Sequence, residues 1–303
     1  MLDCDPGIDD SLAILLALAS DELDVRAITT TFGNAELRQT TKNALNVLEL
    51  SRIKNPPPVG AGSGQPLKVT CVDLARGVHG IDGLGNRDLP PPKLKVTTND
   101  GIGLLISKIN SGEVDTIIAT GPLTNLARAI SRDPEILRRI KEIYIMGGAV
   151  FVDGNITPYA EFNFYCDPNA ADYVLNSEIP INLISLDVTH KVNITEAHIA
   201  PFKKYTNRLS EFVVSIIEYS INYHRAHRGA TGAHLHDPLA VAYAVKPRLG
   251  KYEELSLGVD CTEKRGMVQI KSGPKNVRFV REINENGFLK LFLDRIGGAI
   301  EAI

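Results

Sequence analysis

Tryptophan is absent from this 303-residue sequence, methionine occurs only three times, and no apolar run is long enough to cross a bilayer. The longest strongly apolar stretch, residues 12–19, lies between Asp9 and Asp10 on one side and Asp21 and Glu22 on the other. A membrane-spanning helix needs about 20 consecutive apolar residues, so we expect no transmembrane segment. No basic stretch precedes an apolar segment at the start, so we also expect no secretory signal and a cytoplasmic protein.

A strong excess of either charge is missing as well. Lysine and arginine number 33 against 36 aspartates and glutamates, and no basic cluster suggests a nucleic-acid surface. We therefore expect a small-molecule partner, no nucleic acid and no membrane. Cysteine is scarce and lacks the CxxC spacing of a zinc or redox motif, so we expect reduced thiols, mostly in the core, at Cys4, Cys71, Cys166 and Cys261.

What is present is a repeated alternation of apolar, β-branched segments with helical segments. It predicts an α/β fold, a single domain of residues 1–303 with an open, mainly parallel sheet flanked by helices and a small C-terminal strand portion. Residues 56–92 and 147–165 are predicted to be mostly irregular. The predicted strands are 1–4, 25–31, 115–119, 142–146, 181–186, 255–259, 266–270 and 277–280; the predicted helices are 9–19, 35–50, 100–110, 123–131, 168–176, 195–205, 209–227, 237–244 and 286–296.

Four carboxylates crowd into eight positions near the start of the chain. Like charges this close repel one another and raise one another's pKa, so we expect a bound cation to neutralise them. Calcium and magnesium take carboxylate and carbonyl oxygens, and a short acidic loop supplies several at once. The alternative is that these acids only cap the helix that follows them. The segment reads Asp3-Cys4-Asp5-Pro6-Gly7-Ile8-Asp9-Asp10.

Other polar residues follow the predicted strands directly. In open α/β sheets, ligands bind in the crevice beyond the carboxyl ends of the strands, because the loops converge there and helix N-termini point at the ligand. We therefore expect one site to gather residues from several loops. Besides the acidic loop, its candidates are Asn34, Thr120, Met146, Asn155, Glu161, Asn163 and the segment His236-Asp237-Pro238.

The acidic segment resembles the N-terminal DxDPGxDD signature of the inosine-uridine-type nucleoside hydrolases. Six further motifs occur in the family's order, so the resemblance covers most of the chain. They are Thr31-Phe32-Gly33-Asn34, Val78-His79-Gly80, Thr120-Gly121-Pro122-Leu123-Thr124-Asn125, Met146-Gly147-Gly148, Ala160-Glu161-Phe162-Asn163 and His236-Asp237-Pro238.

This resemblance implies a calcium-dependent enzyme that hydrolyses the N-glycosidic bond of ribonucleosides to free base and ribose, as a homodimer or homotetramer. By the same match, calcium would be held by Asp5, Asp10, the backbone carbonyl of Thr120, and Asp237. The ribose pocket would be lined by Asp9, Asn34, Met146, Asn155, Glu161 and Asn163.

The expected chemistry follows from the bond that is cleaved. Breaking a C–N bond at an anomeric carbon passes through an oxocarbenium-like transition state, which nearby carboxylates stabilise. A calcium-bound water is acidified, Asp5 accepts its proton, and the water attacks C1′ of the ribose. Because calcium also binds diol hydroxyls, we expect 2′-deoxynucleosides to be poor substrates.

The base must also leave, and histidine is the expected helper. We expect His236 to act as acid or base contact and His79 as a loop contact. Tyr223, His224, His227 and Arg228 either face the base or form an exposed helix end. The absence of tryptophan removes a simple stacking platform for purines and, with His236, favours a pyrimidine-preferring or broad specificity.

Two other functions fit parts of this pattern. A haloacid-dehalogenase-like phosphatase also begins with a strand and DxD, and uses magnesium with an aspartyl nucleophile. The loop of such a phosphatase has no need for Pro6-Gly7 followed by paired aspartates. A non-catalytic calcium and ribose-binding protein would keep the same ligands without turnover.

Overall fold

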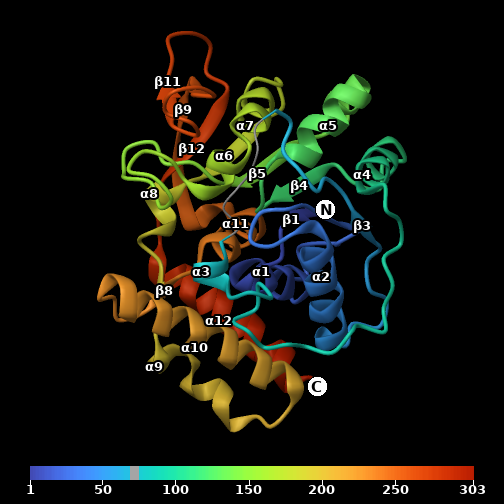
Figure 1. Cartoon of the computed structure of the whole chain (residues 1–303), viewed down its shortest axis with the longest axis vertical. Helices are drawn as coiled ribbons and strands as arrows, with labels where there is room; N and C mark the ends of the chain where they lie inside the picture. The colour runs from blue at the N-terminus through green and yellow to red at the C-terminus, as the bar shows by residue number, and fades with distance from the viewer. Residues whose placement is uncertain (69–74) are drawn as a thin grey trace.

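An eight-stranded sheet forms the centre of the computed structural model, which describes residues 1–68 and 75–303 (Figure 1). Seven strands run parallel, and the edge strand β9 pairs antiparallel with β12. The fold class is thereby confirmed. In spatial order the strands are β3 (Val59–Ala61), β2 (Ile28–Thr30), β1 (Leu2–Cys4), β4 (Thr116–Ala119), β5 (Glu142–Met146), β6 (Ile181–Ile184), β12 (Val277–Ile283) and β9 (Gly250–Leu255).

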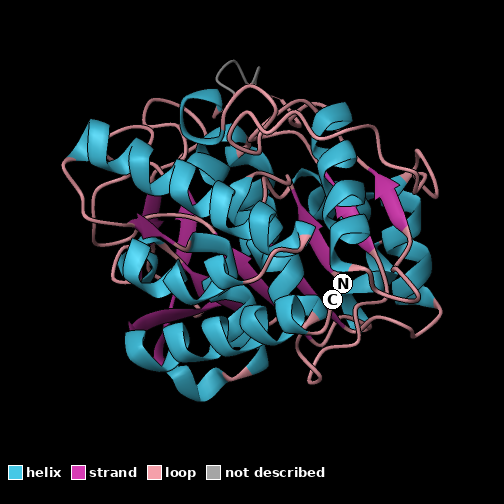
Figure 2. Cartoon of the chain, turned by 90° about the horizontal axis from the view of Figure 1, so that it is seen from below, coloured by secondary structure: helices cyan, strands magenta, loops and turns pink. Residues whose placement is uncertain are grey.

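Helices cover both faces of this sheet, as Figure 2 shows, and each layer closes its own apolar core. One layer contains α1 (Ile8–Leu18), α2 (Leu37–Ser51), α10 (Arg208–Arg228), α11 (His236–Val245) and α12 (Glu285–Glu301). The other contains α4 (Gly101–Asn110), α5 (Thr124–Arg132) and α7 (Pro168–Leu175).

The central elements are apolar because they are covered on every side. The strand β5 has the sequence EIYIM, and the four residues from Ile143 on are buried, as expected for a parallel strand between two helical layers. The helix α1 is apolar on most of its faces and packs against α11. A helix that is hydrophobic all round belongs inside a protein, so the acidic residues at its start are held at the buried sheet edge.

Several short elements complete the chain. They are α3 (Arg76–His79), α6 (Phe162–Cys166), α8 (Leu186–Thr189), α9 (Glu196–Ile199), the pair β7 (Asn193–Ile194) and β8 (Ala233–His234), the pair β10 (Leu257–Val259) and β11 (Val268–Ile270), and the 3-10 turns Pro134–Arg138, Ala200–Lys204 and Pro247–Leu249. Across residues 1–68 and 75–303, no helix has the length and apolarity to span a bilayer.

Four predictions about elements are corrected. The segment 56–64 contains β3, which was missed because a three-residue Val-Gly-Ala strand has no readable period. The last residues of the predicted loop 147–165 belong to α6. The predicted helix 195–205 is α9 followed by a 3-10 turn. Of the predicted C-terminal strand portion, β12 instead joins the main sheet, and only β10 and β11 form a separate hairpin.

Three of the four cysteines lie in the described residues. Cys4 and Cys166 are buried and Cys261 is half-buried, in agreement with the expected core location. Cys71 lies outside the described residues.

Candidate active site

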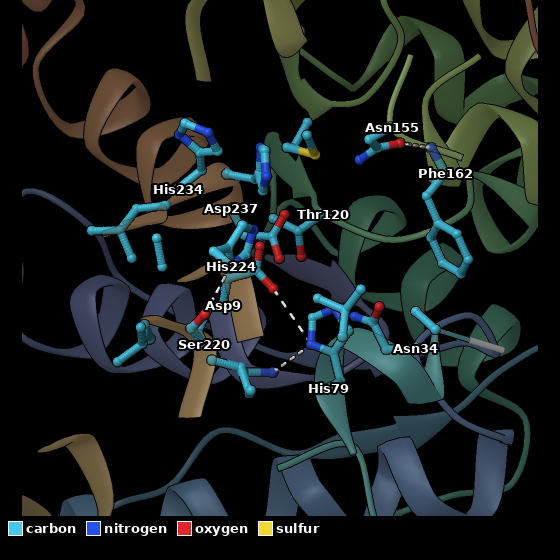
Figure 3. A pocket seen from close by; sticks show the side chains of 18 of the residues that line it. Asp9, Asn34, His79, Thr120, Asn155, Phe162, Ser220, His224, His234 and Asp237 are labelled. Atoms are coloured by element: carbon cyan, nitrogen blue, oxygen red, sulfur yellow. Dashed lines mark hydrogen bonds and ion pairs between the residues drawn. The ribbon is translucent and has the colours of Figure 1, made fainter. Parts of the chain in front are cut away.

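A cavity of about 310 Å³ opens at the carboxyl edge of the parallel strands. Figure 3 shows Asp9, Thr120 and Asp237 between His234 on one side and Asn155 on the other. Twelve of the candidate residues line it: Asp9, Asn34, His79, Thr120, Met146, Asn155, Glu161, Asn163, His224, Arg228, His236 and Asp237. Two others, Asp5 and Asp10, are bonded to lining residues from beneath.

Asp10 is the anchor of the acidic loop. Its Oδ1 accepts hydrogen bonds from the Thr120 hydroxyl (2.8 Å) and the Asp5 backbone N–H (3.3 Å). Its Oδ2 accepts from the Gly7 N–H (3.1 Å) and the Asn34 side-chain amide (2.8 Å). Burial and the neighbouring Asp9 charge nevertheless raise the pKa of Asp10. Asp10 thus ties loops that follow three different strands into one unit.

Asp5 has one satisfied and one unsatisfied oxygen. Its Oδ2 accepts the Asn34 backbone N–H at 2.7 Å, whereas its fully buried Oδ1 has no hydrogen-bond partner among the described residues. Burial, followed by the Asp10 charge, raises the pKa of Asp5 well above its usual range. A buried carboxylate oxygen without a donor is costly, which makes Oδ1 a natural ligand for a cation.

Asp9, Asp10 and Asp237 form the tightest acidic group. Each offers one oxygen, and these three oxygens lie within 4.8 Å of one another. The pKa of Asp237 is raised well above normal by burial and by the charges of Asp10 and Asp9, and that of Asp9 rises to about 6, chiefly through burial. The group shares Asp10 and Asp237 with the ligand set that the sequence suggested, but contains Asp9 in place of Asp5.

Glycines make room for this acidic loop. A Cβ on Gly33, whose φ is +150°, would collide with the Asp5 carboxylate, and one on Gly121 would lie 2.7 Å from Asp5 Oδ1. Only glycine allows both loops to approach so closely. Asp3 lies deeper, where its Oδ1 accepts from the Thr29 hydroxyl (2.6 Å) and the Asn125 amide (2.8 Å), so it supports the strands and does not line the cavity.

The loop after β5 carries the polar side chains proposed for the sugar. Glu161 caps α6 by accepting the backbone N–H groups of Asn163 and Phe164, and burial raises its pKa to about 7. The Asn163 side-chain amide donates to the carbonyls of Thr120 (2.7 Å) and Met146 (3.2 Å). This loop is therefore locked to the ends of two strands.

Two further contacts shape this side. Asn155 Oδ1 accepts the Phe162 N–H at 2.9 Å. His79 Nδ1 accepts the Ile8 N–H at 3.1 Å and lies 3.9 Å from Asp9 Oδ1. Because burial lowers the pKa of His79 to about 4, His79 is neutral near pH 7 and carries its proton on Nε2.

Histidines dominate the other end of the cavity. The rings of His190, His224, His234 and His236 form a cluster with neighbouring centroids 5.1 to 6.0 Å apart. Nδ1 of His224 lies 2.8 Å from the Ser220 carbonyl and Nδ1 of His234 lies 3.1 Å from the Val192 carbonyl. Since a carbonyl only accepts, both rings carry a proton on Nδ1.

His236 is the most enclosed ring of this cluster. Its Nδ1 lies 2.8 Å from the Thr189 hydroxyl, and burial lowers its pKa well below the usual range, with a further contribution from His234. Of the other helix-end candidates, His224 and Arg228 line the cavity, whereas Tyr223 and His227 stack on each other with centroids 4.3 Å apart and are not lining residues.

Three members of this histidine end were missed from the sequence: Thr189, His190 and His234. A signal existed for each. Thr189 and His190 follow the predicted strand 181–186, where the sheet-edge rule applies. His234 lies two residues before the His236-Asp237-Pro238 motif.

Comparison with known proteins identifies the family of this chain. Residues 1–290 match the family model described as inosine-uridine preferring nucleoside hydrolase. A pyrimidine-specific ribonucleoside hydrolase RihA of Citrobacter koseri is 40% identical over 98% of this chain and 97% of that protein. RihA of Shigella flexneri is 39% identical with the same coverage.

Solved structures of nucleoside hydrolases have the same fold as this chain. A purine-preferring ribonucleoside hydrolase from Gardnerella vaginalis superposes with a TM-score of 0.95 at 29% identity, covering 100% of this chain and 99% of that one. A plant nucleoside hydrolase, PpNRh1, gives a TM-score of 0.90 at 32% identity and 97% coverage of both chains. The family assignment decides against the phosphatase and the non-catalytic binding protein. The chain belongs to the inosine-uridine preferring nucleoside hydrolase family, whose members are N-glycosyl hydrolases of ribonucleosides.

Proposed function

We propose that this enzyme uses a calcium ion to hydrolyse pyrimidine ribonucleosides, such as uridine and cytidine, to ribose and free base. The observation that carries the proposal is the division of one cavity into a carboxylate end and a histidine end. A ribose needs several hydroxyl partners, and a departing base needs hydrogen-bonding partners next to its ring. The two ends offer these in one 310 Å³ space.

The residues at the carboxylate end suit a calcium ion. Asp5, Asp10 and Asp237 with the Thr120 carbonyl would hold it, and the nearby Asp9 oxygen lies on the same side. Support comes from the raised pKa of every acid in this group and from the unpartnered, buried Asp5 Oδ1. Hard oxygen donors of this kind favour calcium over softer metals. When bound, calcium supplies a Lewis acid and a positive charge that offsets the carboxylates.

The protein's own groups carry out the rest of the reaction. The oxygen of the attacking water bonds to C1′, and Asp5 accepts a proton from that water. At the same time the C1′–N bond breaks, and the base leaves with the electron pair. Asp9, Glu161 and Asn163 hold the sugar. Their negative charge and carbonyl-type oxygens stabilise the positive charge that develops on the ribose ring.

The pyrimidine preference rests on the histidine end. Because the His224 Nδ1–H donates to the Ser220 carbonyl, its Nε2 is an acceptor available to a donor such as N3–H of uracil or the exocyclic amine of cytosine. Arg228 lines the same end and would donate to a base carbonyl. The RihA relatives are named pyrimidine-specific, whereas the Gardnerella neighbour is named purine-preferring, so the shared fold leaves base preference to these side chains.

A substrate panel tests this function directly. We would measure reducing-sugar release from uridine, cytidine, inosine, adenosine and 2′-deoxyuridine, with and without a chelator. We expect the two pyrimidine ribonucleosides to be cleaved fastest, 2′-deoxyuridine poorly, and all cleavage to stop after thorough calcium removal. Equal cleavage of 2′-deoxyuridine, or activity that survives chelation, would overturn the proposed role of calcium. The expected homodimer or homotetramer is tested by light scattering on the same preparation.

A further inference from the structure

A single hydrogen bond links the short helix α8 to the histidine end of the cavity. It joins the Thr189 hydroxyl, on the last residue of α8, to Nδ1 of His236 at 2.8 Å. Thr189 has no exposed surface and does not line the cavity. We propose that Thr189 is a positioning residue, which fixes the His236 ring so that its Nε2–H faces the leaving base. This inference rests on the proposed nucleoside hydrolysis.

The direction of this hydrogen bond follows from the surroundings of Thr189. A hydroxyl carries one proton, and among the described residues the Thr189 Oγ1 makes no other hydrogen bond. If His236 Nδ1–H donated to Oγ1, the buried hydroxyl proton would have no acceptor, at a cost of about 1–3 kcal/mol. The hydroxyl therefore donates to Nδ1. Since a neutral imidazole then holds its proton on Nε2, the nitrogen left for the cavity is a donor.

Neighbouring rings hold His236 in place but do not choose its tautomer. His190 and His234 pack beside it, each with its centroid 5.7 Å from that of His236. Aromatic packing of this kind limits ring movement, yet it is nearly indifferent to which nitrogen carries the proton. Thr189 is thus the only described group bonded to a His236 nitrogen.

The helix that carries Thr189 is itself firmly attached. Asp187, two residues earlier, accepts the backbone N–H groups of Val150 (2.9 Å) and Phe151 (2.8 Å), and its Oδ2 also lies 2.8 Å from the Ser185 hydroxyl. These bonds tie α8 to the loop that carries Asn155. A positioning hydroxyl on a fixed element can hold a ring within the narrow geometry that catalysis needs.

The chemistry shows why the tautomer matters. When the C1′–N1 bond of a pyrimidine nucleoside breaks, the electron pair stays with the base and spreads onto its carbonyl oxygens. An Nε2–H donor stabilises this charge, whereas a bare Nε2 lone pair would repel it. A ring in the wrong tautomer keeps its place and loses its function. The proton that the base finally takes comes from solvent, and Asp5 returns the water proton there.

Three variants and two substrates test this role. Thr189→Val removes the hydroxyl at nearly constant shape, Thr189→Ser keeps it, and Thr41→Val is a matched control that removes a buried hydroxyl bonded to Thr30 and Leu37, away from the cavity. Uridine needs help with its leaving group. A 4-nitrophenyl riboside does not, because nitrophenolate is a stable anion.

We expect Thr189→Val to lower kcat for uridine about 10- to 100-fold with little change in KM, and to leave the 4-nitrophenyl riboside unaffected. Thr189→Ser should restore most of the uridine activity, and Thr41→Val should match the intact enzyme. Equal losses on both substrates would assign Thr189 a merely structural role and overturn the proposal, as would unchanged uridine turnover.

A spectroscopic measurement separates this inference from the proposed function. The ¹⁵N chemical shifts of His236 report its tautomer in the intact protein without any turnover. We expect a protonated Nε2 that becomes a mixture in Thr189→Val. A protonated Nδ1 in the intact protein would overturn the inference, whereas failure of the intact enzyme to cleave either riboside would overturn the function and leave the tautomer result standing.

Discussion

The two ends of the cavity solve the problem of burying ionisable groups in opposite ways. At the carboxylate end, the acids lie so close together that the hydrogen bonds to Asp10 do not remove the repulsion, and Asp5 Oδ1 has no donor among the described residues. At the histidine end, burial keeps the rings neutral, and three of them direct Nδ1 to a carbonyl or hydroxyl. One end therefore needs a cation, whereas the other works through the placement of neutral N–H groups and lone pairs.

The largest effect on activity is expected when a negative charge is removed from the carboxylate end. We expect Asp5→Asn to lower kcat for uridine by about 10³-fold or more, because the amide cannot accept the water proton and binds a cation less well. Steady-state kinetics measure the loss, and the exposed Glu263→Gln serves as the control for removal of one negative charge. A drop below about tenfold would show that Asp5 is not the proton acceptor.

A smaller effect is expected at the histidine end, and it should depend on the leaving group. His236→Ala should slow uridine hydrolysis about 10²-fold and should affect the 4-nitrophenyl riboside less than about threefold. Asp5→Asn should slow both substrates alike, because water attack is common to them. If His236→Ala harmed both substrates equally, the functional division between the two ends would be wrong.

Without calcium, the burial and mutual repulsion of the acids at the carboxylate end should make the stability of the protein depend on pH. The buried acids have raised pKa values, so the folded state holds protons that the unfolded state has lost, and the free energy of unfolding falls as pH rises through this window. The histidines have lowered pKa values and act in the opposite sense, but only below about pH 6.5, their usual range. Above it, Glu161, with a pKa of about 7, still titrates, and burial raises the pKa values of Asp5 and Asp237 in the same direction.

We therefore expect the chelated protein to lose about 1 kcal/mol of unfolding free energy between pH 6.5 and pH 8, on the scale of 1.4 kcal/mol for each pKa unit. Urea unfolding followed by circular dichroism at several pH values measures this slope. Saturating calcium should remove most of it, because a bound cation favours the ionised acids. A slope of the opposite sign, or one that calcium leaves unchanged, contradicts the idea that these acids need an ion.

The smallest effect is expected for base choice. Arg228 is exposed at the rim of the cavity, so its charge is well screened by solvent. We expect Arg228→Gln to lower kcat/KM for uridine by only about two- to fivefold and to reduce the uridine-to-inosine ratio. Competition assays with both nucleosides measure this ratio directly. An unchanged ratio would assign base choice to the buried His224 and its neighbours alone.

Much of the fold and the carboxylate end followed from the sequence. The regular alternation of strands and helices predicted the parallel sheet, because such a sheet buries continuous apolar strands between amphipathic helices. The order of the motifs also named Asp5, Asp9, Asp10, Asn34 and Asp237. The structure brings these to one strand edge, as the topology of an open α/β sheet requires.

What the sequence could not supply was the pairing of distant, individually ordinary residues. The strand β3 exists only because β2 offers it an edge, since Val-Gly-Ala has little strand preference of its own. Thr189 and His236 are 47 positions apart, and no local pattern marks Thr189 as more than a buried polar residue. Sequence thus determined the periodic elements and the acidic loop, where the physics is local. Tertiary structure alone decided which nitrogen of each histidine faces the cavity, because tautomers depend on hydrogen-bond partners that packing brings from elsewhere in the chain.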